Sequence, residues 1–370
     1  MSGALDGIVI ADFSRVLAGP YATMLLADLG ARVIKIERPE LGDDTRSWGP
    51  PFAGDGMSTY FHSVNRNKQS VALDLKTEGG VEQARAIIEQ ADIVIENFPT
   101  GTMKKFGLDY ESLSSNRPEL IYCSITGFGS ADAAADLPGY DLLVQAVGGL
   151  MSITGESDNH FKVGVALVDV ITGLHAVMGI QAAILHRNAT GEGQKIELSL
   201  LKSLLSAMVN QSSAWVSGGV VPAALGNSHP SIAPYELFSA ADGDFVVAIG
   251  NDAQFRILCD ALGLNDVSSD VRFVNNPARV AHRAELATIL NTTFAQESVQ
   301  HWVDRLRAAK LPVGPIHTIA KAFEFAESLG LEPIVEIDAA RYVSHPVEYS
   351  KSTINYSHAA PQLAAENQDA

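Results

Sequence analysis

The chain has 370 residues, of which 46% are hydrophobic and 19% charged, and its formal net charge is −17 at pH 7. Two domains are expected at this length. The negative charge argues against nucleic acid as a main partner, because phosphate backbones are bound by basic surfaces. No apolar run approaches the length of a membrane span, no signal peptide is visible, and Cys123 and Cys259 build no disulfide framework. We therefore expect a cytoplasmic protein that binds no membrane.

The first forty residues predict a β-α-β unit. Residues 7–13 read as a buried strand, residues 21–29 as an apolar helix that Gly30 closes, and residues 31–37 as a second strand. Such a unit implies an α/β fold with a parallel sheet and crossover helices. A nicotinamide dehydrogenase is one function of this architecture. Gly19 is the sole glycine between strand and helix, however, so the G-x-G-x-x-G fingerprint of that class is missing.

The rest of the chain continues this alternation and then changes in composition. The expected elements of the first part are strands at residues 70–75, 91–96, 120–124 and 195–201 and a long apolar helix at 170–186. A second unit begins near Ser217. Its expected elements are a strand at residues 245–250 and amphipathic helices at 255–262, 284–294 and 302–309.

One acidic residue stands where it can be either structural or catalytic. In Pro138-Gly139-Tyr140-Asp141, a turn precedes an apolar, helix-like run, and Asp141 falls in its first turn. An aspartate in this place is ordinarily a cap for the free N–H groups of the helix. The alternative is a carboxylate nucleophile that attacks a carbonyl carbon and carries an acyl group covalently. The local sequence leaves both interpretations open.

Seven short segments, in this order along residues 8–349, together resemble the family III CoA-transferases. The segments are Asp12-Phe13-Ser14-Arg15-Val16-Leu17-Ala18-Gly19-Pro20, Val33-Ile34-Lys35-Ile36-Glu37-Arg38-Pro39, Asn65-Arg66-Asn67-Lys68, Glu96-Asn97-Phe98, Thr126-Gly127-Phe128-Gly129, Pro138-Gly139-Tyr140-Asp141 and Gly226-Asn227-Ser228-His229. Among members, the stretch from Ser47 to Arg66 is most similar to the succinyl-CoA-dependent dicarboxylate transferases.

The resemblance implies a fold. Residues 1–216 would form a large, Rossmann-like, CoA-binding domain, residues 217–325 a smaller α+β domain, and residues 326–370 a tail that returns to the large domain. Two chains would thread through each other as interlocked rings in a homodimer.

The resemblance also implies a reaction. An acyl-CoA donor gives its CoA to a small, free carboxylic acid, most simply a dicarboxylic acid, through an aspartyl mixed anhydride and an aspartyl-CoA thioester. Asp141 matches the aspartate that carries the acyl group. The oxyanions of the intermediates would be stabilised by backbone groups near Leu17 and Ala18 or near Gly226 to Ser228. CoA is then a co-substrate, and no histidine spacing in the chain indicates a metal site.

Further residues take roles by the same resemblance. The positions that match CoA contacts are Val16, Ala18, Arg38, Leu73, Lys76, Asn97, Phe98 and Lys105. The loop from Gly226 through Asn227 to His229 matches the segment that closes over the acyl intermediate, although His229 can also be a hydrogen-bonding loop residue. Arg46 and Arg66 are candidates for binding the free carboxylate of a dicarboxylic substrate, because guanidinium binds carboxylate bidentately. Ion pairs within the protein are the alternative for both arginines.

Three alternative functions remain. The α-methylacyl-CoA racemases of the family are similar over the same stretch but have a histidine base directly before the aspartate. This chain has Tyr140 there, next to the candidate Asp141, and a tyrosine is a poor base at neutral pH. Asp169 matches the second racemase acid, and without its partner we expect a helix cap or a hydrogen-bond acceptor in the core. A nicotinamide dehydrogenase and a non-catalytic acyl-CoA-binding protein are the other two.

Overall fold

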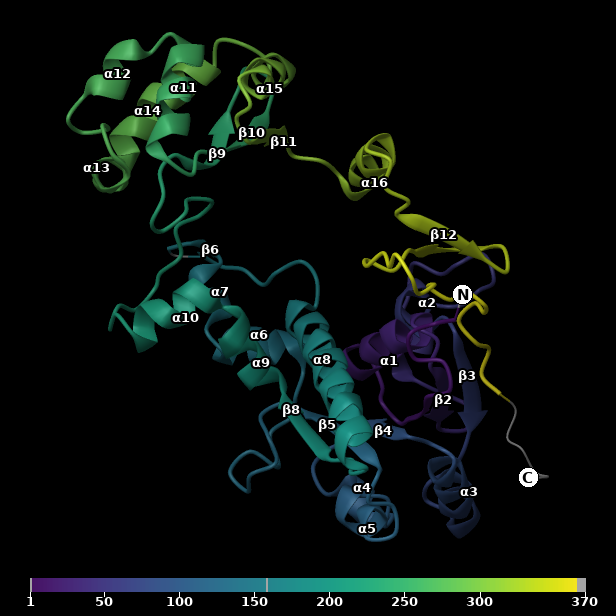
Figure 1. The fold of residues 1–370 in the computed structure, drawn as a ribbon. Coiled ribbons are helices and arrows are strands. Elements are labelled where there is room, and N and C mark those ends of the chain that lie inside the picture. Colours follow the sequence, from purple (N-terminus) through teal and green to yellow (C-terminus); the bar gives the residue numbers. More distant parts are fainter. Residues whose placement is uncertain (1, 158, 365–370) are drawn as a thin grey trace. The chain divides into compact units, whose positions relative to one another are not determined.

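The computed structural model describes residues 2–157 and 159–364. The chain divides into two compact units (Figure 1). The first comprises Met1–Met151, Lys162–Val221 and Glu332–Ala370, and the second comprises Ser152–Phe161 and Pro222–Leu331. The short segment Ser152–Phe161 belongs to the second unit, which the composition of the chain gave no reason to expect. The domain limits given in the sequence analysis remain a prediction.

The first unit is built on a parallel sheet of six strands in the order β3-β2-β1-β4-β5-β8. The strands are β1 (Val9–Asp12), β2 (Arg32–Glu37), β3 (Lys68–Ala72), β4 (Ile93–Glu96), β5 (Ile121–Thr126) and β8 (Lys195–Ser199). The chain runs outward from β1 through β2 and β3, and then returns to add β4 on the other side of β1. Such a reversal between neighbouring strands is where open α/β sheets bind ligands, at the carboxyl ends of the strands.

Alternate residues of these strands pack into two separate cores, one on each face of the sheet. Ile10, Val33, Ile93 and Ile121 face one core, and the next residue along each strand faces the other. Side chains alternate between faces in a strand, so a strand that is buried on both faces is a continuous apolar run. This burial explains why the strands were recognisable in the sequence.

Helices cover both faces of the sheet. The helices from residue 18 to residue 216 are α1 (Ala18–Asp28), α2 (Thr59–Asn65), α3 (Glu78–Glu89), α4 (Thr102–Lys105), α5 (Tyr110–Ser114), α6 (Asp141–Val147), α7 (Leu150–Ile153), α8 (Leu167–Thr190), α9 (Leu200–Ala207) and α10 (Val209–Val216), with the 3-10 helix η1 (Asp44–Ser47). α1, α8 and α9 contribute to the core on one face, and α3, α4 and α5 to the core on the other.

The long helix α8 lies beside α1 (Figure 1). A Cβ on Gly173 would lie 2.7 Å from the carbonyl oxygen of Ala18, so a glycine is needed for this close approach. By length and composition α8 also passes as a membrane span. The expectation that no apolar run approaches that length is therefore wrong. The helix contributes Val168 and Ile180 to the core, as the core helix of a globular domain does.

The second unit holds an antiparallel sheet in the order β11-β10-β9, made of β9 (Tyr235–Ser239), β10 (Asp244–Ala248) and β11 (Val313–Pro315). Its helices are α11 (Asp252–Leu262), α12 (Asn265–Ser269), α13 (Asn276–Ala281), α14 (Arg283–Phe294), α15 (Val299–Ala308) and α16 (Ile319–Ser328). Its core is rich in aromatic rings, and Phe294 contacts Phe238, Phe245 and Trp302 edge to face. A hairpin of β6 (Gly155–Glu156) and β7 (Asn159–His160) completes it.

The last part of the chain packs on the first unit. The hairpin of β12 (Ile334–Ile337) and β13 (Ala340–Val343) shares a small core with Phe61 of α2. Asn67 then binds the segment that follows, since its side chain accepts a hydrogen bond from the backbone of Ser357 at 2.9 Å and donates one to the carbonyl of Asn355 at 2.7 Å.

Candidate active site

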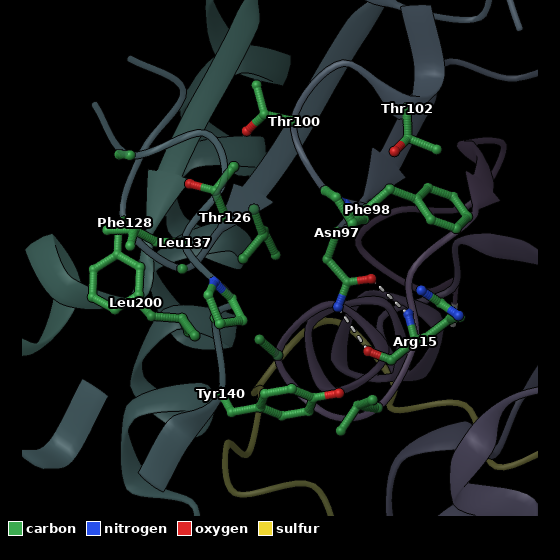
Figure 2. Close-up of a pocket in the computed structure, with 18 of the residues that line it drawn as sticks. Arg15, Asn97, Phe98, Thr100, Thr102, Thr126, Phe128, Leu137, Tyr140 and Leu200 are labelled. Atoms are coloured by element: carbon green, nitrogen blue, oxygen red, sulfur yellow. Dashed lines mark hydrogen bonds between the residues drawn. The ribbon is translucent and has the colours of Figure 1, made fainter. Parts of the chain in front are cut away.

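A cavity of about 540 Å³ opens at the carboxyl ends of the neighbouring strands β1 and β4, where the order of the strands reverses. The loops that follow β1, β4 and β5 line it, together with residues 134–140 and the first turn of α8. In Figure 2, Phe128, Leu137 and Leu200 lie on one side of the cavity, and Arg15 and Phe98 lie on the other. One wall is thus apolar, and the opposite wall carries a cation.

The loops after β1 and β4 are joined at this place. The side chain of Asn97 accepts a hydrogen bond from the backbone N–H of Arg15 at 2.9 Å and donates one to the carbonyl of Arg15 at 2.7 Å (Figure 2). The Arg15 guanidinium lies 5.0 Å from the centre of the Phe98 ring, a cation–π contact. Asn97 therefore fixes the backbone of Arg15 and leaves its charge at the cavity wall.

A second cavity, of about 170 Å³, shares Arg15 and Phe98 with the first. All eight residues predicted to contact CoA line one or both cavities. Val16, Ala18, Asn97, Phe98 and Lys105 line the larger one, and Arg38, Leu73, Lys76 and again Phe98 line the smaller one. The structure thus brings these residues together around two adjoining spaces.

Arg15 is a functional candidate that the sequence reasoning did not single out. It lines both cavities, and its Nε atom is buried with no hydrogen-bond partner among the described residues. Asp44 lies 3.7 Å from its guanidinium and also pairs with Arg38. Arg15, Arg38, Lys76 and Lys105 give the two cavities several cations in a chain of strongly negative net charge. Such a group suits an anionic ligand.

Asp141 begins α6, but its carboxylate caps a different helix. One oxygen accepts hydrogen bonds from the backbone N–H groups of Val168 at 2.8 Å and Asp169 at 3.3 Å, in the first turn of α8. The other oxygen accepts a hydrogen bond from the Gln145 side chain at 2.5 Å. Three donors therefore hold this carboxylate, and Asp141 is absent from the lining of the cavity among the described residues.

Asp169 lies on α8 and does line the cavity. It stands one helical turn before Gly173, on the face of α8 that packs against the start of α1. The described residues place no hydrogen-bond donor on its carboxylate. Burial, and then the nearby charge of Asp141, raises the pKa of Asp169 to about 7. An unpaired carboxylate with a raised pKa, facing a cavity, is the expected form of a reactive group rather than of a cap.

Asp169 makes the folding stability depend on pH. Its pKa is about 7 in the folded state, against an ordinary value of 3.8, so the charged form costs stability fully above pH 7 and not at all below pH 4. We expect Asp169→Asn to raise the free energy of unfolding by about 2–4 kcal/mol at pH 8. The gain should shrink as the pH falls through 7 and vanish near pH 4. Urea unfolding at pH 8, 6 and 4 measures it, and a pH-independent difference would contradict the assignment.

One tyrosine lines the larger cavity, and the charges of the two aspartates act on a second. Tyr140, which the sequence placed next to the candidate Asp141, precedes α6, is 64% exposed and lines the cavity. Tyr60, which the sequence reasoning missed, lies close enough to both carboxylates to respond to them. Burial, then the charges of Asp169 and Asp141, raise the pKa of Tyr60 to about 12. Its hydroxyl is therefore protonated in neutral solution and is able to donate a hydrogen bond.

The comparisons with known proteins agree with this site. A family model described as CoA-transferase family III matches residues 5–367. The chain belongs to this family. A succinate–glutarate CoA-transferase of Agrobacterium fabrum is 43% identical over 97% of this chain and 92% of its own. An acetyl-CoA:oxalate CoA-transferase of Acetobacter aceti is 38% identical over 94% and 90%.

A solved structure extends the likeness to the fold. The crystal structure of a CaiB/BaiF family protein from Brucella suis has a TM-score of 0.88 and 41% sequence identity, over 98% of this chain and 97% of that one. The family predicted from the seven segments is confirmed. The chain is a CoA-transferase, and a CoA thioester is its co-substrate. The alternatives of a nicotinamide dehydrogenase and of a non-catalytic binding protein lose their support.

The two arginines proposed as carboxylate clamps of this transferase already have carboxylate partners. Arg46 binds Glu37 through both ends of its guanidinium, at 2.8 and 2.7 Å. Arg66 binds Asp28 in the same way, and only 2% of Arg66 is exposed. Neither arginine lines the two cavities among the described residues. The ion-pair alternative accounts for these contacts, and the sequence could not reveal it because the partners lie 9 and 38 residues away in the chain.

The loop predicted to close over the acyl intermediate belongs to the second unit. Gly226 has a φ of +61° and donates its N–H to the carbonyl of Gly155 at 2.8 Å. Asn227 follows, and the His229 ring lies 5.3 Å from the Tyr235 ring and accepts a hydrogen bond from the backbone of Ser231 at 3.1 Å. These contacts fit the hydrogen-bonding role for His229. The closing role of the loop stays a prediction.

Proposed function

We propose that this CoA-transferase moves CoA from succinyl-CoA to another small dicarboxylic acid, through a covalent intermediate on Asp169. Relatives named for succinyl-CoA, glutarate and oxalate support the choice of substrates. One observation carries the mechanism: among the described residues, the half-buried carboxylate of Asp169 lines the cavity and accepts no hydrogen bond, whereas the other lining carboxylates pair with arginine, as Asp44 does, or are exposed, as Asp136 is. The sequence favoured Asp141, but three donors hold that carboxylate, so its lone pairs are less free to attack.

The steps need no net proton transfer. Asp169 attacks the thioester carbonyl of the donor, and CoA leaves as a thiolate, which gives a mixed anhydride. The thiolate attacks the Asp169 carbonyl carbon and releases the donor acid as a carboxylate. The acceptor carboxylate then attacks the aspartyl-CoA thioester and again frees the thiolate. Attack of the thiolate on the acceptor's carbonyl gives the new acyl-CoA and restores Asp169.

Asp141 has a positioning role in this scheme. Its carboxylate binds the backbone of Asp169 and thereby fixes the start of α8. Its charge also raises the pKa of Asp169, which makes the carboxylate of Asp169 a better nucleophile once it is ionised. Gln145 extends the arrangement, because it binds Asp141 with its amide nitrogen and accepts a hydrogen bond from Val163 at 2.9 Å.

CoA binding is proposed to depend on the cations of the two cavities. Lys105→Ala is expected to raise the KM for succinyl-CoA about tenfold with little change in kcat, because it removes a charge that faces the phosphates. Lys104→Ala is the matched control, since Lys104 is its neighbour on α4 and lies outside both cavities. Steady-state kinetics at low and high salt measure both variants. Equal KM values for the two would contradict the assignment of Lys105.

We also propose an intertwined homodimer in the cytoplasm. Large apolar side chains are exposed on α8 and α10 of the single chain. Met178 and Leu185 are 64% and 71% exposed, and Trp215 and Val216 are 59% and 79% exposed. Surfaces of this kind mark protein interfaces. Light scattering that finds a monomer at micromolar concentration would contradict the dimer. Cys123 and Cys259 are buried free thiols, in keeping with a reducing compartment.

The activity is tested directly with succinyl-CoA and a panel of free acids. Glutarate, oxalate and mesaconate are the dicarboxylates, butyrate is the monocarboxylate control, and chromatography follows the new acyl-CoA. Formation of a dicarboxyl-CoA with release of succinate supports the proposal. A racemase would instead exchange the α-proton of a branched acyl-CoA in deuterated water with no acceptor present. That outcome, without transfer to any acid, would overturn the proposed function.

A further inference from the structure

We propose that Asp43 is a positioning residue for CoA transfer. Its carboxylate holds Val16 in a left-handed backbone conformation, and this conformation places the first turn of α1 at the cavity. The inference rests on the proposed function, in which CoA transfer takes place beside Asp169. Asp43 is absent from the segments that resemble the family, and it reacts with nothing itself.

Val16 has an unusual backbone. Its φ is +70°, in the left-handed region, and it is a β-branched residue. Such residues rarely adopt a positive φ, because their side chain clashes with the backbone there. A conformation of this kind persists only where the surroundings impose it, and it is concentrated at functional sites. Val16 lines the larger cavity, directly before Leu17, the N-cap of α1.

Asp43 is the group that imposes it. Its two carboxylate oxygens lie 3.2 and 3.4 Å from the backbone nitrogen of Val16, which donates its N–H to them. Lys35 binds the same carboxylate at 2.9 Å, and Thr45 binds it through its hydroxyl at 2.8 Å. Asp43 is 1% exposed. Burial alone would raise the pKa of Asp43, but Lys35 and Thr45 hold it at about 2, so the acceptor is ionised in neutral solution.

The residues before Val16 are also held by groups other than Asp43. Ser14 donates its backbone N–H to the Asp12 carboxylate at 2.9 Å, and Asn97 fixes the backbone of Arg15 on both sides. Because Ser14 and Arg15 are fixed by other groups, loss of Asp43 would release Val16 itself. Val16 is then free to return to a negative φ, which would redirect the chain at the entry to α1.

The entry to α1 matters because it shares the cavity with Asp169. Leu17 is the N-cap of α1 and has no side-chain acceptor, and Leu17 and Ala18 both line the cavity. Gly173 brings α8 against Ala18, one turn after Asp169 on the same face. The positive end of α1 therefore faces the space where a thioester carbonyl gains negative charge during transfer. A shift of this turn by one ångström is sufficient to reduce the rate.

A double-mutant cycle tests the inference. Asp43→Asn is made in the Val16 protein and in a Val16→Gly background, because glycine adopts a positive φ without strain. In the Val16 protein, we expect Asp43→Asn to lower kcat/KM for transfer from succinyl-CoA by about 10- to 100-fold. In the Val16→Gly background, the same change should lower kcat/KM by about threefold or less. Glycine keeps the positive φ without the hydrogen bond from its backbone to Asp43. If Asp43 only stabilised the fold, Asp43→Asn would lower kcat/KM by the same factor in both backgrounds. That result would overturn the proposal.

Asp92→Asn is the matched control. Asp92 also accepts a backbone N–H, from Val9 at 2.8 Å, and pairs with a cation, Arg187 at 2.9 Å, but it lies outside both cavities. It should lower the melting temperature and leave kcat/KM within about twofold, as is usual for changes away from the reacting atoms. If Asp43→Asn does not fold, Thr45→Val removes a single bond to Asp43 and must show the same dependence on the background.

Different results would refute the proposed acceptor acid and the proposed role of Asp43. If the wild-type chain transfers CoA to none of the tested acids, the substrate proposal fails, and the same cycle is measured as calorimetric binding of succinyl-CoA. Loss of affinity in Asp43→Asn that Val16→Gly reverses supports the inference in either case. Unchanged kcat/KM and unchanged affinity in a folded Asp43→Asn protein would overturn it.

Discussion

Asp169→Asn is expected to lower kcat for CoA transfer by at least about 10³-fold, because it removes the group that becomes covalently attached to the substrate. The variant keeps the size and shape of the side chain, and we expect it to be more stable than the wild type above pH 7. Loss of activity together with a gain in stability separates a catalytic role from a structural one. Activity with succinyl-CoA and unfolding at pH 8 are measured on the same preparation.

Asp141→Asn is the matched variant, since it changes a neighbouring carboxylate in the same way. It should lower kcat less, by about 10- to 100-fold. The asparagine still caps α8 in part, but the backbone of Asp169 loses a charged hydrogen-bond partner. It should also move the acidic limb of the pH–rate profile to lower pH, because the charge of Asp141 raises the pKa of Asp169. If Asp141→Asn were the inactive variant and Asp169→Asn the active one, the two roles would be reversed.

Arg66→Met is expected to destabilise the first unit by about 3–5 kcal/mol, because it leaves the buried carboxylate of Asp28 without its cation. Burial raises the pKa of Asp28 even with Arg66 present, and loss of Arg66 would raise it further. The folded chain then holds an unpaired charge above that pKa and a neutral carboxyl below it. The destabilisation should therefore be largest at high pH and should decrease as the pH falls.

This prediction also separates the two interpretations of Arg66. An ion pair implies a loss of stability with a nearly unchanged KM for the acceptor acid, whereas a substrate clamp implies a raised KM in a protein of normal stability. Arg272→Met is the control, because Arg272 pairs with Asp270 at 2.7 Å on the surface, where solvent and salt screen an ion pair and it contributes little to stability. Urea unfolding at pH 6 and pH 8, with kinetics for each variant, measures the difference.

The sequence predicted the parallel sheet well, for a physical reason. Strands buried on both faces tend to be apolar runs: β1 and β4 are apolar up to their last residue, and β2 is apolar at Val33, Ile34 and Ile36. The same reasoning missed the full length of α8, which begins at Leu167 rather than near residue 170. A helix start that is capped by Asp141, distant in the chain, carries no local signal.

The sequence predicted some residues of the candidate site and missed others. Every residue expected to contact CoA lines one of two adjoining cavities, because those residues lie in the loops at one edge of the sheet. The choice between Asp141 and Asp169 could not be made in the same way. Both carboxylates lie near the start of a helix, and only the hydrogen bonds show that Asp141 is the one already bound by donors of the protein. Arg15 and Tyr60 were missed because nothing local marks a loop arginine or a helix tyrosine as part of a site.

The most direct test of the account is the position of the covalent intermediate. The enzyme is incubated with succinyl-CoA and then with hydroxylamine, which converts an activated carboxyl into a hydroxamate, and the peptides are sequenced by mass spectrometry. We predict a hydroxamate on Asp169 in the wild type, and none in Asp169→Asn. A hydroxamate on Asp141, or no modified carboxyl while CoA transfer proceeds, would contradict the assignment of Asp169 as the residue that carries the acyl group.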